Sequence, residues 1–387
     1  MSSTTERPSG GNDALPPPPV APVVGLVGSA GAYGRWLRGY FEQRMGLRVL
    51  GHDPADPASD TPEQLVEHAD VLVFAAPIRA VPELVARYVA LSAGRERGRL
   101  WLDVTSLKQA PVAAMLQSQA EVVGLHPMTA PPKAPTLKGR VVVVCQARLQ
   151  HWQPWLQQLL QGLQGEYVHA EPAHHDQVMA LVQALVHALH LGQAAVLREL
   201  AVGLGGPAAL LPFRSGAFEM DMAVISRILS LNPALYEDIQ FGNPHTGVVL
   251  EQLAAQIDHL RALVRRGDEA ARAQFREHFL TASRQAWGDV AEEGGYTFER
   301  IGYLLADLTE TRSLSVHLPQ DRAGSLRELL HVFEQHGISL ASIHSSRTPA
   351  GEVHFRIGFD AGVGLEELRA AAQAIDRSGR GRVLEQP

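Results

Sequence analysis

The chain has 387 residues, more than one hydrophobic core usually supports, so two or three domains are expected. Its net charge of -7 and its lack of a dense Lys or Arg run argue against nucleic acid as a partner. The single cysteine, Cys145, lies in an apolar run, which excludes an intramolecular disulfide framework and favours a buried thiol in a reducing compartment.

The N-terminal segment, residues 1–21, is rich in Pro, Gly and Ser and lacks the charged-then-apolar order of a signal peptide. We therefore expect a disordered tail and a cytoplasmic protein. The most hydrophobic segment, around Val178–Leu191, contains His and Gln, so no apolar stretch approaches the ~20 residues of a membrane span. The sequence thus predicts a soluble protein.

Residues 22–150 alternate short Val- and Leu-rich runs with helical stretches. The runs are Val23–Val27, Leu47–Leu50, Val71–Ala75, Leu100–Val104, Val122–Leu125 and Val141–Cys145. Continuous apolar strands that alternate with helices indicate a parallel sheet covered on both faces. We expect a Rossmann-like, doubly wound α/β domain here.

A glycine-rich turn, Gly28-Ser29-Ala30-Gly31-Ala32-Tyr33-Gly34, follows the first run and is a variant of the dinucleotide fingerprint. Such glycines let the backbone approach a pyrophosphate at the positive end of a helix dipole. Asp53 follows the second run, where a carboxylate binds ribose hydroxyls and repels a 2′-phosphate, so NAD is favoured over NADP. The expected cofactor-binding residues are Gly28, Gly31, Ala32, Tyr33, Gly34, Asp53, Ala76, Pro77 and Thr105. Two alternatives stay open: an ordinary strand-to-helix turn capped by Asp53, and a core position for Tyr33.

Residues 151–308 change to Ala, Leu, Gln and His, with apolar residues at every third or fourth position. Beyond the segment around Val178–Leu191, candidate helices run through Asp221–Leu231, Val248–Arg266 and Glu269–Val290. We expect an all-α second domain for substrate binding and dimerisation. Long apolar helices of this kind often bury their surplus surface against a second copy, so a homodimer is expected.

Residues 312–387 read as a third domain with the order βαββαβ. The expected strands are Ser313–Leu318, Ser339–Ser345, Glu352–Phe359 and Arg382–Glu385, and the helices are Ser325–His336 and Leu365–Arg377. This order is typical of a ferredoxin-like unit with its own core.

Two polar segments, Asp103–Lys108 and Gly124–Met128, follow apolar runs of the first domain. Their side chains should project at the crevice where a nicotinamide would lie. The Gly-Leu-His-Pro-Met segment after Ser106-Leu107-Lys108, downstream of the glycine turn, resembles the prephenate dehydrogenase family. The similarity covers roughly Val23 to Asp289 and includes His175–Gln177, Gln183–His187, Ser226–Ile228, Asn232–Ile239 and Trp287–Asp289.

The resemblance implies NAD-dependent oxidative decarboxylation of prephenate to 4-hydroxyphenylpyruvate, a step of tyrosine biosynthesis. It assigns His126 as the base, Ser106 as a hydroxyl partner and Lys108 as a nearby cation. It further implies that Arg227 holds a substrate carboxylate and that His187 is a second polar contact. A histidine suits the task because its ordinary pKa of ~6.5 lies close to working pH.

Simpler roles remain open for these residues: His126 as a turn residue, Arg227 in a surface salt bridge, and His187 as a core histidine bonded to Gln183. His174, His175 and His190 lack metal-ligand spacing, so Asp176 is interpreted as a helix-start residue and no metal is expected.

Substrate choice is open because two segments depart from the family pattern. Thr129–Lys133 replaces a Gly-containing loop, and Phe218-Glu219 stands where some relatives carry a basic residue. Prephenate is preferred, with arogenate or dual use as alternatives, and Glu219 would suit an ammonium. A 3-hydroxy acid oxidoreductase is disfavoured because its usual lysine has no counterpart in Met179–Leu200. The alternative of another class is a catalytically silent NAD- and amino-acid-sensing protein.

Leu318–Leu326, together with Ile343–Arg347, resembles the ACT domain family that binds amino acids. The resemblance implies feedback regulation, with tyrosine or phenylalanine as the effector. The implied effector-binding residues are Asp321, Gly324, Ser325 and Leu326, since Gly324 lets N–H groups at a helix start meet a carboxylate. A purely structural or dimerising module is the alternative.

Overall fold

The computed structural model describes residues 17–132, 134–309, 312–318, 322–347, 353–379 and 381–385. The expected N-terminal tail therefore lies mostly outside the described residues. By its internal contacts the chain divides into two units, Met1–Ala254 and Ala255–Pro387, and the division falls within one long helix.

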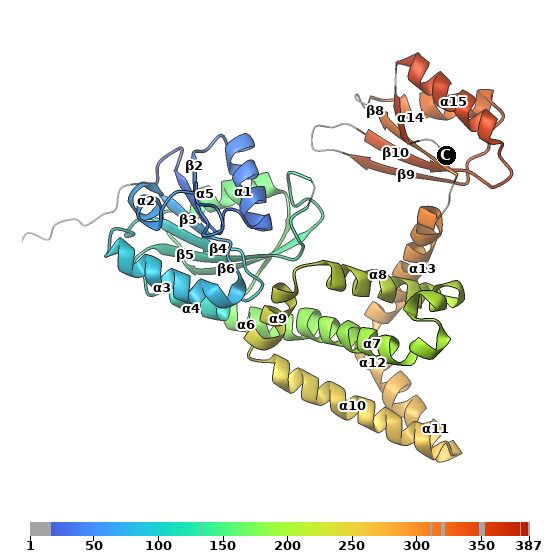
Figure 1. Cartoon of the computed structure of the whole chain (residues 1–387), viewed down its shortest axis with the longest axis horizontal. Helices are drawn as coiled ribbons and strands as arrows, with labels where there is room; N and C mark the ends of the chain where they lie inside the picture. Colours follow the sequence, from blue (N-terminus) through green and yellow to red (C-terminus); the bar gives the residue numbers. More distant parts are fainter. Residues whose placement is uncertain are drawn as a thin grey trace, which may run out of the picture. The chain divides into compact units, whose positions relative to one another are not determined.

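A seven-stranded sheet forms the first part of unit one, with the strand order β2-β1-β3-β4-β5-β6-β7 (Figure 1). The strands are β1 (Val24–Val27), β2 (Val49–His52), β3 (Val71–Phe74), β4 (Leu100–Asp103), β5 (Glu121–Pro127), β6 (Val141–Arg148) and β7 (Glu166–His169). Strands β1 to β5 pair parallel, which confirms the Rossmann-like sheet. Their carboxyl ends consequently meet at one edge, where ligands of such sheets bind.

The last two strands differ from the expectation of one parallel sheet. β6 pairs antiparallel with β5, and β7 pairs parallel with β6. The described residues between β5 and β6 contain no helix, whereas a parallel neighbour needs a crossover of roughly a dozen residues or more, usually helical. The sheet runs to His169, so the expected domain boundary at residue 150 falls inside it.

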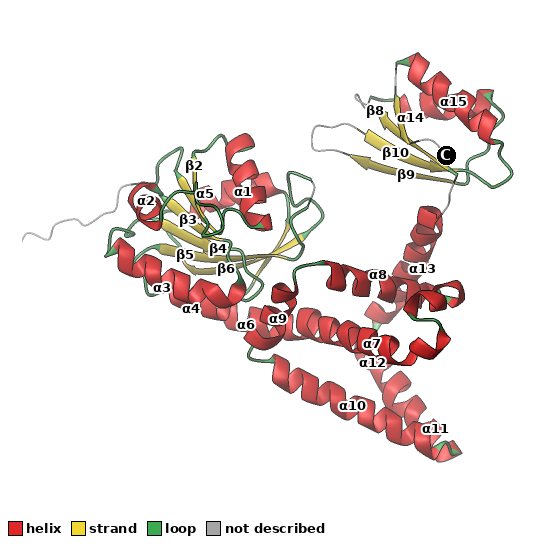
Figure 2. Ribbon diagram, in the orientation of Figure 1, coloured by secondary structure: helices red, strands yellow, loops and turns green. Residues whose placement is uncertain are grey.

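Helices cover both faces of this sheet (Figure 2). They are α1 (Ala32–Gln43), α2 (Pro62–His68), the short η1 (Ile78–Ala80), α3 (Val81–Ser92), α4 (Gln109–Met115) and α5 (Gln153–Leu163). Leu26 of β1 packs in a core with α1 and α5, whereas its neighbour Val27 packs in a second core with α2, α3 and α4. Both faces of the strands are thus apolar, which explains the continuous Val- and Leu-rich runs.

An all-α segment follows, as expected. It contains α6 (Pro172–Met179), the π-helical turn η2 (Ala180–Leu185), α7 (Val186–Leu200), the 3-10 turns η3 (Val202–Leu204) and η4 (Pro207–Phe213), α8 (Gly216–Ser230), α9 (Pro233–Gly242) and α10 (Thr246–Arg266). The expected helix Glu269–Val290 is divided into α11 (Glu269–Phe275), the π-helical turn η5 (Arg276–Thr281) and α12 (Ala282–Trp287), followed by α13 (Asp289–Thr309).

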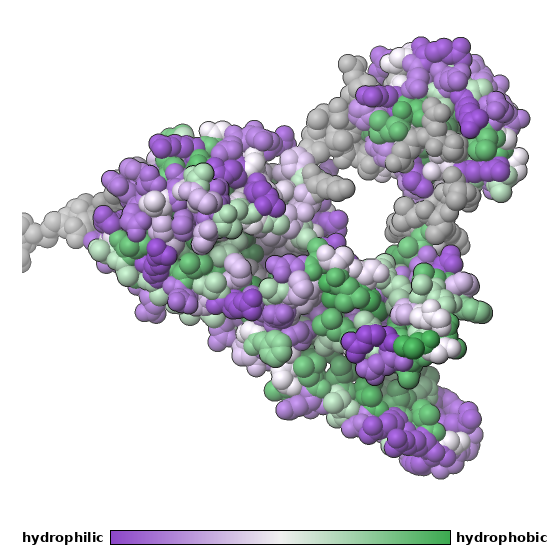
Figure 3. Space-filling model, viewed as in Figure 1, coloured by the Kyte–Doolittle hydropathy of each residue, from purple (hydrophilic) through white to green (hydrophobic). Residues whose placement is uncertain are grey.

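One continuous helix, Pro172–Leu200, is long and apolar enough to cross a membrane, and it is the one such helix among the described residues. Its most apolar window has a mean hydropathy of 1.5, so the expectation that no stretch approaches a span is wrong by length and composition. Only 11% of that window is buried within the chain. Figure 3 shows apolar residues gathered over α7 and α8. The exposed apolar side chains of η2, α7 and α8 include Leu181, Val182, Leu189, Val196 and Leu229.

The C-terminal part of unit two is the expected ferredoxin-like unit. Its elements are β8 (Ser313–Leu318), α14 (Ser325–Gln335), β9 (Ser342–Arg347), β10 (Val353–Gly358), α15 (Leu365–Ser378) and β11 (Arg382–Glu385). The strands form an antiparallel sheet of order β11-β8-β10-β9. Leu314, Phe333 and Phe359 belong to its separate core.

Candidate active site and effector cavity

The glycine turn after β1 leaves no space for side chains at Gly28 and Gly34. Gly28 has a φ of +89°, and a Cβ there would lie 2.7 Å from the Ala75 carbonyl oxygen. A Cβ on Gly34 would collide with the Gly28 carbonyl oxygen, because α1 packs directly on the turn. These are the tight turn and the close helix packing that a dinucleotide-binding turn requires.

The first turn of α1 is open to an anion. Gly31 is the N-cap and offers no side chain to the first-turn N–H groups, and no acidic residue lies in that turn. The positive end of the helix dipole therefore points at the carboxyl edge of the sheet. The chain order reverses between β1 and β3, so the turn lies at the switch point, with Ala76 and Pro77 in the loop after β3.

Asp53 is fixed beside this turn directly after β2. Its carboxylate accepts hydrogen bonds from the N–H of Ala30 at 3.0 Å and of Ala55 at 2.9 Å. A carboxylate oxygen has two lone pairs, so both oxygens keep acceptor capacity for ribose hydroxyls. The residues present thus fit a dinucleotide without a 2′-phosphate.

Two of the expected cofactor-binding residues, Tyr33 and Thr105, form hydrogen bonds within the chain. Tyr33 packs against the sheet core and donates its hydroxyl to the Thr129 carbonyl oxygen, and burial raises the pKa of that hydroxyl. Thr105 is buried, and its hydroxyl lies 2.6 Å from the Asp103 carboxylate and 2.8 Å from the Leu107 carbonyl oxygen. Both hydroxyls thus bond within the chain, to loops at the edge of the sheet.

His126 lies near the carboxyl end of β5 and is only 2% exposed. Its Nδ1 is 2.9 Å from Nε2 of His175, and Nδ1 of His175 is 2.7 Å from the Asp176 carboxylate. No hydrogen bond from any described residue reaches Nε2 of His126. Burial, then electrostatic repulsion between the charged forms of His126 and His175 and from Lys108, holds the pKa of His126 well below 6.5, so this imidazole is neutral at pH 7.

His175 and Asp176 are functional candidates that sequence reasoning missed. Asp176 was expected only to start a helix, yet its carboxylate also accepts the N–H groups of Lys108 at 2.8 Å and Gln109 at 3.0 Å. Its carbonyl oxygen accepts from the Asn243 side chain at 2.7 Å. The available signal was the His-Asp-Gln segment among the family similarities.

Lys108 does not occupy the position expected of a substrate cation. Its side chain is fully buried, forms an ion pair with Asp103 and donates to the Leu125 carbonyl oxygen at 2.9 Å. Burial lowers the pKa of Lys108, and Asp103 opposes that effect. Gly124 makes room for it, since a Cβ there would lie 2.9 Å from Cδ of Lys108. Lys108 therefore supports the strand ends beneath His126.

Ser106 remains a candidate hydroxyl partner. It lies in the loop between β4 and α4, is half-buried, and has no hydrogen-bond partner in the part of the chain that is described. Its neighbour Leu107 packs in a small cluster with Ile78, Ala184 and Ile239. This cluster brings the loops after β3 and β4 against the π-helical turn η2 and helix α9.

Arg227 and His187 both lie near Tyr236. Arg227 is exposed on α8, forms no ion pair with a described residue, and lies close enough to lower the Tyr236 pKa that burial raises. The His187 ring packs edge-on against Tyr236 with ring centroids 4.9 Å apart. A surface salt bridge therefore does not explain Arg227.

The expected hydrogen bond between Gln183 and His187 is absent. Nδ1 of His187 and Oε1 of Gln183 are both buried without a protein partner in the described ranges. The π-helical turn η2 changes the spacing of Gln183 relative to the next helical turn. Two unsatisfied polar atoms beside a π-helical turn are typical of a ligand site. Glu219, by contrast, is paired with Arg214 at 3.3 Å.

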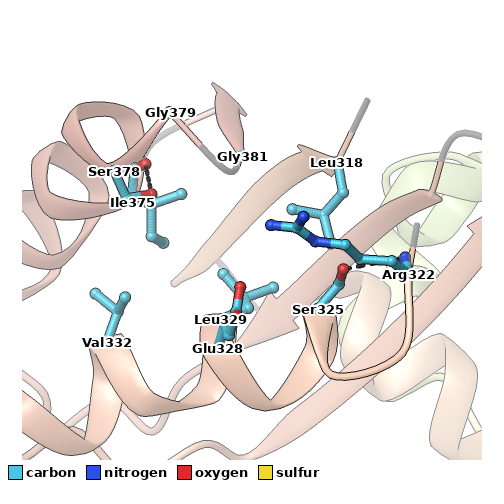
Figure 4. A pocket seen from close by; sticks show the side chains of 10 residues that line it. All are labelled: Leu318, Arg322, Ser325, Glu328, Leu329, Val332, Ile375, Ser378, Gly379 and Gly381. Atoms are coloured by element: carbon cyan, nitrogen blue, oxygen red, sulfur yellow. Dashed lines mark hydrogen bonds between the residues drawn. The ribbon is translucent and has the colours of Figure 1, made fainter. Parts of the chain in front are cut away.

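The ferredoxin-like unit holds a cavity of about 270 Å³ between α14 and α15. Figure 4 shows Arg322 extending over it, with Ser325 and Glu328 on α14 and Ser378 at the end of α15. The other lining residues are Leu318, Leu329, Val332, Ile375, Gly379 and Gly381. Among the expected effector residues, Ser325 lines the cavity, Gly324 is the α14 N-cap with a φ of +97°, and Leu326 is exposed. Asp321 lies outside the described residues.

Three family models match the chain in order. Residues 55–170 match the prephenate dehydrogenase nucleotide-binding domain, 171–281 the prephenate dehydrogenase dimerization domain, and 312–376 the ACT domain. The first match ends at residue 170, directly after β7, which agrees with the extended sheet.

Curated relatives carry related names. A probable arogenate/prephenate dehydrogenase of Methanocaldococcus jannaschii is 27% identical over 74% of this chain and 66% of its own length. The T-protein of Enterobacter agglomerans is 28% identical over 66% of this chain and 65% of its own. The chain thus spans about two thirds of the length of these relatives. A 4-amino-4-deoxyprephenate dehydrogenase of Streptomyces pristinaespiralis is 31% identical over 63% of this chain and 85% of its own length.

Two solved structures share the fold. The prephenate dehydrogenase of A. aeolicus, in complex with hydroxyphenyl propionate and NAD+, has a TM-score of 0.54 at 18% identity, covering 69% of this chain and 98% of that one. Synechocystis arogenate dehydrogenase has a TM-score of 0.50 at 19% identity, covering 68% and 98%. From the ordered domain matches and the curated relatives, the chain belongs to the prephenate dehydrogenase family and carries a C-terminal ACT domain.

Proposed function

We propose that the chain is an NAD-dependent prephenate dehydrogenase of tyrosine biosynthesis that works in the cytoplasm. The observation that carries this proposal is the environment of His126. Its imidazole is neutral and buried, with Nδ1 hydrogen-bonded to His175 and Nε2 without a partner among the described residues, at the same sheet edge as the glycine turn. The names of the relatives point to the same class of substrate.

The chemistry requires a base, a hydride acceptor and a cation. Prephenate loses the proton of its ring hydroxyl and a hydride from the same carbon while the ring carboxylate leaves as carbon dioxide. NAD, when bound, supplies the hydride acceptor. In this proposal Nε2 of His126 takes the hydroxyl proton, Ser106 orients the hydroxyl, and Arg227 binds a carboxylate. The two unsatisfied atoms of Gln183 and His187 are further polar contacts for the substrate.

The deciding experiment follows NADH absorbance when the purified full chain meets NAD with prephenate, arogenate or 4-amino-4-deoxyprephenate, each repeated with NADP. We expect prephenate with NAD to give the highest kcat/KM. A higher kcat/KM with arogenate would assign the alternative, an arogenate or dual-substrate enzyme. Binding of NAD and an amino acid without turnover of any compound would support the other alternative, a catalytically silent sensor.

We also propose that the ACT domain provides feedback control by tyrosine or phenylalanine. The cavity between α14 and α15 is lined by an arginine, serine hydroxyls and aliphatic side chains, which suit an amino acid with an apolar side chain. Calorimetric titration of the full chain with each amino acid tests this. Val332→Trp should fill the cavity and abolish binding while basal turnover is kept. Binding that survives this substitution would place the effector elsewhere.

A homodimer completes the proposal. Apolar side chains remain exposed along α7 and α8, and residues 171–281 match a domain described as a dimerization domain. Covering such a face by a second copy is the common way to remove apolar surface from water. Light scattering should give twice the 41.9 kDa chain mass, and a monomer at micromolar concentration would contradict this part.

A further inference from the structure

The hydrogen bonds around His126 fix where its proton lies. A carboxylate only accepts, so Nδ1 of His175 must donate to Asp176 at 2.7 Å. In neutral His175, Nε2 is then an acceptor and receives the Nδ1–H of His126 at 2.9 Å. The remaining nitrogen of His126, Nε2, carries the lone pair. Asp176 thus determines, through His175, which nitrogen of His126 can accept a proton.

We propose that His126, His175 and Asp176 form a proton relay. When Nε2 of His126 accepts a proton, the Nδ1 proton of His126 moves to His175, and the positive charge then lies on His175 beside the Asp176 carboxylate. This inference rests on the proposed function, since it assumes that His126 takes the substrate hydroxyl proton.

Charge is better placed on His175 than on His126. His126 is buried and faces the ammonium of Lys108, and both effects lower its pKa. His175 is equally buried, at 1% exposure, but contacts a carboxylate directly, which forms a hydrogen-bonded ion pair once the ring is charged. Among the described groups nearby, Asp103 is paired with Lys108, and the Cys145 thiol, whose pKa burial raises to about 11, interacts electrostatically with Lys108, Asp103 and Asp176.

The proton steps balance. The O–H bond of the substrate breaks and an N–H bond forms at Nε2 of His126, while its Nδ1–H proton moves to Nε2 of His175. The hydride leaves the same substrate carbon for NAD. The ring carboxylate leaves as carbon dioxide, and the electron pair of the broken C–C bond passes through the ring to the oxygen as phenolate, which takes a proton from solvent to give the phenol of the product. The site then holds neutral His126, protonated at Nε2, and an imidazolium at His175 paired with Asp176.

The relay predicts how activity is lost at low pH. In the relay a proton taken up from solvent at Nε2 of His126 follows the same path as the substrate proton, and His126 is then protonated at Nε2 and cannot act. The loss of activity at low pH is therefore a property of the two hydrogen-bonded rings together and not of His126 alone. Without His175, the base is His126 alone, whose lowered pKa shifts this loss to lower pH.

The test is His175→Gln in the full chain. The Gln side chain can accept from Nδ1 of His126 through its oxygen and donate to Asp176 through its nitrogen, so orientation is kept while proton acceptance is lost. His174→Gln, the same change at the exposed neighbouring position, is the matched control. The measurement is kcat against pH with saturating substrate and NAD, with NAD affinity and melting temperature measured for each protein.

For His175→Gln we expect kcat on the plateau to fall by about 100-fold or more and the acid limb to move to lower pH. His174→Gln should match the wild type. A variant that keeps the wild-type kcat overturns the relay, and so does one that loses rate with the acid limb unmoved, which would leave His175 only an orienting role. Wild-type protein that oxidises none of the proposed substrates would instead reject the proposed function.

Discussion

The buried ion pair of Lys108 and Asp103 gives the sharpest test of where sequence reasoning and structure disagree. Lys108→Met removes the ammonium and keeps most of the aliphatic volume. Asp103 then stays at 0% side-chain exposure with the hydroxyl and N–H of Thr105 as partners for Oδ2, while its Oδ1 has no partner among the described residues even now. Breaking such a pair costs about 3–5 kcal/mol, because the surviving charge is buried and uncompensated.

That free energy corresponds to roughly two to three and a half powers of ten in the folded-to-unfolded ratio. Removing both charges should cost much less, since apolar groups of similar volume often replace a buried pair without loss. The double variant Asp103→Leu/Lys108→Met should therefore be more stable than Lys108→Met alone. A double variant that is more stable than the single variant shows that the two charges stabilise the fold as a pair.

Urea unfolding followed by tryptophan fluorescence measures these free energies, because Trp101 is buried on β4 next to Asp103. The same samples are assayed for kcat and for the KM of the substrate. A Lys108→Met protein of unchanged stability with a selectively raised substrate KM would refute this reasoning. That result would restore Lys108 as a substrate cation.

Further predictions concern the reacting groups and the cofactor. His126→Asn should lower kcat by about 10²–10⁴-fold and remove the acid limb, while NAD affinity, measured by fluorescence titration, is kept; an unchanged pH–rate profile would exclude His126 as the base. Asp53→Ala should weaken NAD and improve relative use of NADP, and unchanged kcat/KM ratios for the two would reject its contact with ribose. Arg227→Ala should weaken substrate binding by roughly 2–5 kcal/mol with NAD affinity unaltered, and equal losses for both would indicate misfolding. Truncation after Thr309 should leave turnover and abolish the response to tyrosine or phenylalanine, so a truncated enzyme that stays sensitive would contradict the ACT assignment.

The sheet was predictable where its strands are buried on both faces. The runs that became β1, β3 and β4 were placed within a residue or two because water is excluded from both sides of them. β7 was missed because its sequence, Glu166–His169, is polar and largely exposed at the sheet edge. The antiparallel direction of β6 could not be predicted, since a continuous apolar run does not show in which direction its strand pairs.

The site was predictable only in part. Strand-end position identified His126 and Lys108, but whether a lysine there faces a ligand or a buried carboxylate depends on the space that Gly124 leaves. The contact of His126 with His175 joins residues 49 apart in sequence and depends on how α6 packs on the sheet edge. Helical periodicity likewise cannot reveal the π-helical turn that contains Gln183 and ends just before His187.

Asp176 also links the activity of the base to the position of helix α6. The carboxylate that orients His175 from α6 is the acceptor for the first N–H groups of α4. If α6 lifts away from the sheet edge, these bonds break together and His126 loses the partner that fixes its tautomer. An open site would therefore lack an oriented base and would not react. Substrate would enter and product would leave in that open form, and His126 would become an active base only when α6 packs on the sheet edge again.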